Sequence, residues 1–130
     1  MRRRIAVFSL ALGLMLAVAG SARAHHSSAL YFDYEAKRVT LTGTLTRLEW
    51  KNPHVQFFVD ARNEKGVVET WSIESNPPNG MAHAKIGKAL FVNAIGRTVT
   101  VEVSPARDGS RFGISRKVTF PDGTVVVTRK

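Results

Sequence analysis

The sequence predicts an all-β domain with one short helix, and three observations lead to this prediction. Several short segments alternate apolar and polar residues, which is the two-residue period of half-buried strands. Turn sequences rich in glycine, proline, asparagine and aspartate separate these segments. A single stretch, residues 80–91, has apolar residues at helical spacing.

The first strand is predicted in VTLTGTLTRLEW, and its pattern indicates a bend. Leu41 and Leu45 share one face with Gly43, and threonines occupy the other face. The apolar positions then change parity to Leu48 and Trp50. A one-residue slip inside a long strand indicates a bulge, and together with Gly43 it predicts a sharply bent strand that serves both sides of a small barrel.

The remaining elements follow in order. The turns between them are NPH, NEKG, NPPNG, PARDGS and PDG. The helical stretch GMAHAKIGKALF places Ala82, Ile86, Ala89 and Leu90 on one face, although Gly87 makes the helix short or broken. The apolar positions of the later strands are Val55, Phe57 and Val59; Val67, Trp71 and Ile73; Val99, Val101 and Val103; Phe112, Ile114, Val118 and Phe120; and Val125 to Val127 in a terminal extension.

This order of three strands, a short helix, two strands and a terminal extension is that of an OB-type fold. We therefore expect an OB-like, five-stranded, partly open barrel with a terminal hairpin extension in residues 39–130. A small β-sandwich is the alternative, because periodicity reveals strands better than their closure. Residues 25–38 are rich in aromatics without clear periodicity, and we expect an N-terminal arm whose rings pack on the domain.

The first 24 residues have the pattern of a cleaved signal peptide. Arginines at positions 2–4 precede an apolar run from Ile5 to Gly20, and Ala22 and Ala24 are the small residues that a signal peptidase reads. The run is shorter than the about 20 apolar residues of a membrane span. We therefore expect cleavage after Ala24, a periplasmic location and no membrane span in the mature protein.

Composition narrows the classes of function. The chain has 19 Lys and Arg against 10 Asp and Glu, a net charge of +9. Four of the basic residues leave with the signal, so the mature protein has 15 basic and 10 acidic residues and a net charge of +5. This mild charge favours anionic partners weakly, and export argues against nucleic acid. The absence of cysteine excludes disulfides, thiolate metal sites and lipoprotein processing.

Four short motifs run through the mature chain: His25-His26-Ser27 after the signal, TGTLTRLEWKNPH, the strand with Trp71, and PARDGS before the last strands. In this combination the chain resembles a family of short exported bacterial proteins that is catalogued as a domain of unknown function. The resemblance covers essentially the whole mature chain. It implies a shared fold and an envelope location, and it implies no activity.

Histidines at the mature N-terminus and in the NPH turn suggest a metal site. Cleavage after Ala24 would give His25 a free α-amino group beside its own imidazole, and these two nitrogens can chelate a metal. His54, after Pro53, or His26 would add a second imidazole. Imidazole suits copper, zinc and nickel, and copper has the highest affinity, so we expect copper binding. The alternative is a solvated chain end and a turn histidine that bonds the local backbone.

A second candidate site follows from the expected fold. The loops between strands 1 and 2 and between strands 4 and 5 flank the binding face of an OB barrel. Here they contain Trp50 and Lys51 in one loop and Arg107 and Arg111 in the other. A stacking aromatic beside cations suits a small anionic ligand such as a sugar acid, a nucleotide or a phosphorylated glycan. The alternative is ordinary turn chemistry, with Trp50 in the core.

Catalysis has little support in the sequence. It contains no serine in a nucleophile elbow, no glycine-rich phosphate loop and no close carboxylate pair on one element. We therefore expect a non-enzymatic periplasmic binding protein, and a copper carrier is the first hypothesis. A binding module for an anionic ligand or glycan is the second, and an envelope interaction protein without a small-molecule site is the third.

Overall fold

The computed structural model describes residues 31, 32, 34, 35 and 38–129. Phe32–Lys130 form one compact unit. The predicted signal peptide, most of the predicted arm, and His25 and His26 lie outside the described residues.

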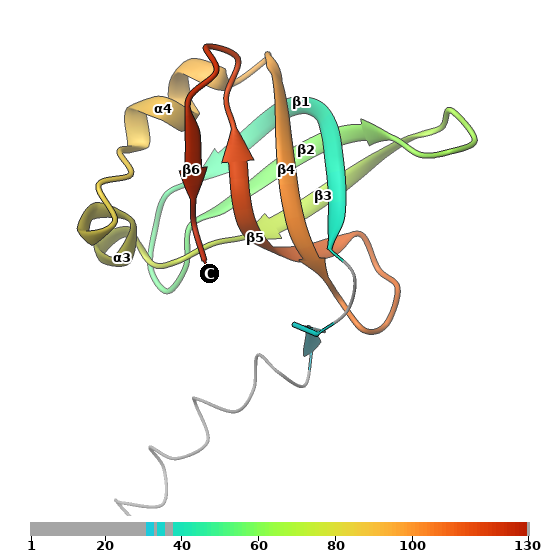
Figure 1. Cartoon of the computed structure of the whole chain (residues 1–130), viewed down its shortest axis with the longest axis horizontal. Coiled ribbons are helices and arrows are strands. Elements are labelled where there is room, and N and C mark those ends of the chain that lie inside the picture. Colours follow the sequence, from blue (N-terminus) through green and yellow to red (C-terminus); the bar gives the residue numbers. More distant parts are fainter. Residues whose placement is uncertain (1–30, 33, 36–37, 130) are drawn as a thin grey trace, which may run out of the picture. The chain divides into compact units, whose positions relative to one another are not determined.

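Six strands and two short helices make up the described part of the chain (Figure 1). In chain order they are β1 (Val39–Glu49), β2 (Gln56–Arg62), β3 (Val68–Glu74), α3 (Pro78–His83), α4 (Lys88–Ala94), β4 (Thr98–Pro105), β5 (Phe112–Thr119) and β6 (Val125–Val127).

Five of these strands close into a barrel. The strands are ordered β3-β2-β1-β4-β5-β6 with antiparallel neighbours, and a parallel pairing of β3 with β5 completes the ring. β6 adds to β5 as the terminal hairpin extension. The predicted all-β, OB-like fold is therefore confirmed. The closing pairing runs only from Ser72 opposite Phe112 to Glu74 opposite Ile114, so the barrel is closed by a short seam.

β1 joins the two halves of the barrel. Its first half pairs with β4 and its second half with β2, and Gly43 has a partner on both sides. The register slips between Leu45 and Arg47, which confirms the bulge expected from the change of parity. A Cβ atom on Gly43 would lie 2.8 Å from the carbonyl carbon of Asp60, so glycine is required for this close approach.

Apolar side chains fill the interior of the barrel. Phe91 of α4 is fully buried, and its ring centroid lies 5.2 Å from that of Phe57 and 5.0 Å from that of Phe120. Since the interior is packed, a ligand must bind on the outside. The buried cluster consists of Leu41, Leu45, Val55, Phe57, Val59, Ala61, Trp71, Ile73, Met81, Ile86, Phe91, Ala94, Val99, Val101, Val103, Val118 and Phe120.

The helical segment is broken into two short helices, as Gly87 suggested. Lys85, between them, has a positive φ of 58°. The break changes the helical phase, so Ala82 and Ala89 of the predicted apolar face are exposed. The side chains of this segment that are fully buried or nearly so are Met81, Ile86, Phe91 and Ala94.

The β2–β3 hairpin extends from the side of the barrel opposite to α3 and α4 (Figure 1). Asn63 organises its turn, because its Oδ1 accepts the N–H groups of Lys65 and Val67, and Gly66 has a positive φ of 76°. Val67, which the sequence placed in the third strand, lies in this turn and is 56% exposed.

Phe32 of the predicted arm packs on the outside of the barrel. Its side chain is buried, its ring centroid lies 5.0 Å from that of Phe112, and its backbone bridges to Ala106. Ile114 is also buried, and neither it nor Phe32 belongs to the interior cluster. This part of the outer face is therefore covered.

Candidate functional site

His54 lies in the loop between β1 and β2, where the following residue is firmly anchored. The side chain of Val55 is fully buried, and its N–H donates to the carbonyl oxygen of Asn76 at 3.1 Å. The imidazole consequently lies at the end of β3, with Nδ1 3.0 Å from Oε1 of Glu74. The His54 side chain is 43% exposed, so the ring is accessible from solvent.

This contact determines which nitrogen of His54 can bind a ligand. With a carboxylate at Nδ1, Nε2 is the nitrogen left for a metal ion, and metal-binding histidines commonly have such a carboxylate at the other nitrogen. Among the described residues, no three His, Cys, Asp or Glu side chains are grouped to hold a metal ion. His54 and Glu74 therefore supply one ligand and the group that orients it.

Trp50 and Lys51 follow β1 at the end of the barrel near the helices. The Trp50 ring is partly buried, and its centroid lies 5.9 Å from that of Phe91. Lys51 Nζ lies 2.9 Å from Oε2 of Glu49, and a hydrogen bond from Lys51 lowers the pKa of Glu49. Trp50 therefore extends the core, and Lys51 pairs with the last residue of β1.

Arg107 and Arg111 lie in the loop between β4 and β5, and both are exposed. Arg111 reaches β3, where its Nε and Nη2 donate to the two carboxylate oxygens of Glu69 at 2.6 and 2.9 Å. Its guanidinium also lies 5.6 Å from the ring centroid of Trp71. The bidentate bond lowers the pKa of Glu69 and raises that of Arg111. This pairing weakens the attraction of Arg111 for an anion.

The structure does not bring the two predicted halves of this site together. Gln56 of β2 pairs with Glu49, next to Trp50, whereas Ala61 of the same strand pairs with Glu69. Five residues of extended chain separate these positions, which corresponds to about 17 Å. The predicted residues therefore belong to two separate surfaces.

A groove of about 310 Å³ lies between the start of β1 and the β2–β3 hairpin. It exists because β1 pairs only with β4 before Gly43, while the hairpin diverges beyond Arg62. Its volume is at the lower end of the about 300–1,000 Å³ of small-molecule sites. The lining residues are Val39, Thr40, Leu41, Ala61, Arg62, Asn63, Glu64, Glu69, Trp71 and Arg111.

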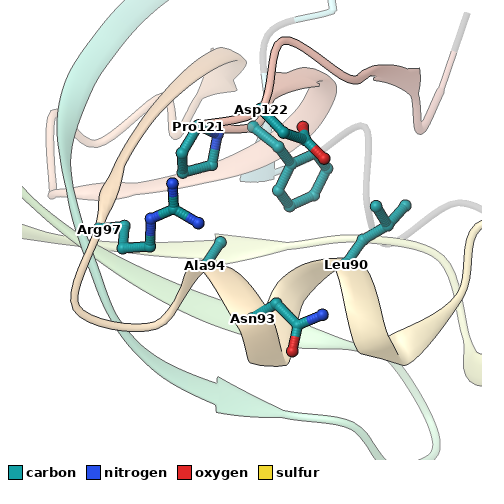
Figure 2. Close-up of a pocket in the computed structure, with 7 residues that line it drawn as sticks. Leu90, Asn93, Ala94, Arg97, Pro121 and Asp122 are labelled. Atoms are coloured by element: carbon teal, nitrogen blue, oxygen red, sulfur yellow. The ribbon is translucent and has the colours of Figure 1, made fainter.

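A second pocket, between α4 and the turn from β5 to β6, is much smaller (Figure 2). Figure 2 shows the Arg97 side chain directed toward Pro121. The volume of about 50 Å³ is enough for a few water molecules and too small for an organic ligand. The lining residues are Leu90, Asn93, Ala94, Arg97, Phe120, Pro121 and Asp122.

Sequence reasoning missed two features of these surfaces. It singled out neither Glu69 nor Glu74, which pair with Arg111 and His54. It also gave no role to Arg116, a buried arginine of β5. Two consecutive basic residues, Arg116 and Lys117, lie in the predicted fifth strand. Consecutive residues of a regular strand point to opposite faces, so this pair was the signal that the two basic side chains have different surroundings.

Comparisons with known proteins place the chain in a family. A family model matches residues 12–116 of the 130-residue chain. No curated protein and no solved structure matches it. No helix in the described ranges is long and apolar enough to cross a membrane. Because the matched segment is well over half of the chain, the resemblance drawn from the motifs is confirmed, and the chain belongs to the family of unknown function DUF6152.

Proposed function

We propose that the mature protein is an exported, non-enzymatic binding protein of the periplasm that holds Cu(II) through His54 and the N-terminal residue His25, with His26 as the alternative second imidazole. The observation that supports this function is the contact of 3.0 Å between His54 Nδ1 and Glu74. The carboxylate orients the ring and makes Nε2 a better ligand. Neutral imidazole nitrogens are ligands that copper prefers.

A single imidazole needs further donors to hold copper. Cleavage after Ala24 would provide them, because the α-amino group and the imidazole of His25 chelate a metal through two nitrogens. The amino group has an ordinary pKa of about 7.7–8.0 and must lose its proton to bind. Copper affinity is therefore expected to fall as the pH decreases.

Copper titration of exported protein without an N-terminal tag tests this function. Electron paramagnetic resonance reports nitrogen ligands, and calorimetry gives the dissociation constant. His54→Ala should remove one nitrogen from the spectrum, and Glu74→Gln should weaken binding about 10–100-fold. His83→Ala is the matched control, because His83 is an exposed histidine at the end of α3. An unchanged spectrum in His54→Ala would contradict the proposal.

The position of the first residue is a separate requirement. Intact-mass measurement of the exported protein should give a chain that begins at His25. A chain that begins elsewhere lacks the proposed chelate, and the copper site would then be rejected even if His54 binds metal weakly.

A second candidate function is a binding module for a small anionic ligand or a glycan. The groove beside the β2–β3 hairpin supports it, because Trp71 and the Glu69–Arg111 pair line a ligand-sized volume. Trp50→Phe would leave Trp71 as the fluorescent residue, because the chain has two tryptophans. Glucuronate and nucleotides should then change the fluorescence, and Arg111→Gln should remove the change. A protein without either response fits the third hypothesis, an envelope interaction protein.

A further inference from the structure

Arg116 of β5 is a buried arginine without an acidic partner in the described part of the chain. Only 8% of its surface is exposed. Its Nε is fully buried and has no hydrogen-bond partner. An unpaired buried charge is strongly unfavourable, and buried charges in proteins are normally paired. The buried Nε of Arg116 therefore keeps an unused hydrogen-bond donor.

A β-bulge places Arg116 in this position. Lys117 pairs with Glu102 across the ladder and Ser115 pairs with Val103, so Arg116 has no residue opposite it in β4. Its carbonyl oxygen accepts the N–H of Thr128 at 2.9 Å. The segment after β6 is thereby fixed alongside Arg116.

Other cations surround Arg116. Arg129 donates from Nη1 to the hydroxyl of Tyr34 at 3.1 Å, and the Arg116 guanidinium lies 5.9 Å from the centre of the same ring. Burial, with repulsion from Arg38 and Arg129, lowers the pKa of Arg116. Arg129 therefore binds the hydroxyl of Tyr34, and Arg116 lies near the ring of the same residue.

Glu102, which lies opposite Lys117 in β4, does not offset this charge. Glu102 lies 3.6 Å from Arg38 and also forms an ion pair with Lys117. One carboxylate thus serves two cations, and neither of them is Arg116 or Arg129. Arg129 also donates to the side-chain oxygen of Asn76, at 3.4 Å, which is a long bond.

We propose that Arg116, Arg129 and the Tyr34 hydroxyl form a binding site for a carboxylate or phosphate group. The planar guanidinium presents paired N–H donors that match both of these anions. The Tyr34 hydroxyl accepts its bond from Arg129, so its own proton is available to donate to the anion. The site uses neither His54 nor the residues of the groove, so it is independent of both candidate functions.

Thermal unfolding of the processed protein in metal-free buffer tests the site. Inorganic phosphate and succinate are compared with sodium chloride at equal ionic strength. At a phosphate concentration about four times the dissociation constant, the unfolding temperature should rise by about 4–8 °C. The larger of the phosphate and succinate responses identifies which anion the site prefers.

Three variants distinguish binding from a structural role. Arg116→Met should unfold at the same temperature as the wild type or higher without anion, because it removes an unpaired buried charge, and it should lose the response to phosphate. Arg129→Gln should weaken the response. Lys88→Gln removes the same charge from an exposed position and should leave the response unchanged.

Two results would overturn the proposal. One is a wild-type protein that responds to phosphate and succinate no more than to chloride. The other is an Arg116→Met variant that unfolds at a lower temperature while it keeps the full response, because Arg116 would then have only a packing role. Calorimetric titration with phosphate checks each result independently of stability.

Discussion

Replacing Gly43 with alanine tests whether the close approach of β1 and β2 is required for the barrel. The new Cβ would lie 2.8 Å from the carbonyl carbon of Asp60 and 2.9 Å from the Cα of Ala61. The carbonyl oxygen of Asp60 would lie closer still. Ordinary contacts begin at 3.4 Å, so β2 would have to move by more than about 0.6 Å. All three neighbours are backbone atoms, which cannot rotate away as a side chain could.

The cost of this movement follows from two effects. Overpacking costs about 1–3 kcal/mol, and each weakened ladder hydrogen bond adds about 1 kcal/mol. We therefore expect Gly43→Ala to lower the free energy of unfolding by about 3 kcal/mol. For a domain of this size, the unfolding temperature would fall by about 12–24 °C.

Urea unfolding followed by tryptophan fluorescence measures this change. Gly87→Ala is the matched control, because Gly87 has an ordinary φ of −84° and no atom lies within 4 Å of the Cβ position. Its free energy of unfolding should change by less than about 1 kcal/mol, because Gly87 is the N-cap of α4 and alanine is only moderately less favourable there. If Gly43→Ala stays within the same limit, the close approach does not constrain the fold and the argument is wrong.

Three further predictions follow from individual contacts. Phe91→Ala should lower the free energy of unfolding in urea by about 3–5 kcal/mol, because it empties the centre of the core. Glu69→Gln should make thermal stability less sensitive to acid below the ordinary carboxyl pKa of 4.5. Arg111 lowers the pKa of Glu69, so the wild-type bond stabilises above the ordinary carboxyl pKa and is lost as the pH falls through the lowered value. Thr128→Val leaves the buried Ser115 hydroxyl without its 2.7 Å partner and should cost about 1–3 kcal/mol, and a double-mutant cycle with Ser115→Ala measures the coupling.

The strands could be predicted because one face of each is buried. Leu41, Phe57 and Val101 lie in the interior as the alternation indicated, and the parity change after Leu45 marked the bulge correctly. Closure of the barrel had no such signal. It depends on a parallel pairing of Ser72 with a residue about forty positions later, and alternation within a strand says nothing about its neighbour.

The candidate sites were harder to predict, because they depend on register. Arg111 meets Glu69, which is 42 residues earlier, only through the pairing of β3 with β5. The expectation that Trp50 would join Arg111 came from the general plan of OB barrels, in which two loops flank one face. In this chain Trp50 follows β1 to the helices and packs on Phe91 instead. The residue types alone could not reveal on which side of the barrel Trp50 lies.

Asn76 connects the proposed copper and anion sites. Its carbonyl oxygen holds Val55, next to His54, while its side chain donates to the Thr128 carbonyl at 2.6 Å and accepts from Arg129 at 3.4 Å. An anion that draws Arg129 away would break the bond between Arg129 and Asn76. The shorter bond from Asn76 to the Thr128 carbonyl would remain, so Asn76 would keep its position. Copper and phosphate should therefore bind independently. A calorimetric dissociation constant for copper that changes when phosphate is added would show that this placement of the two sites is wrong.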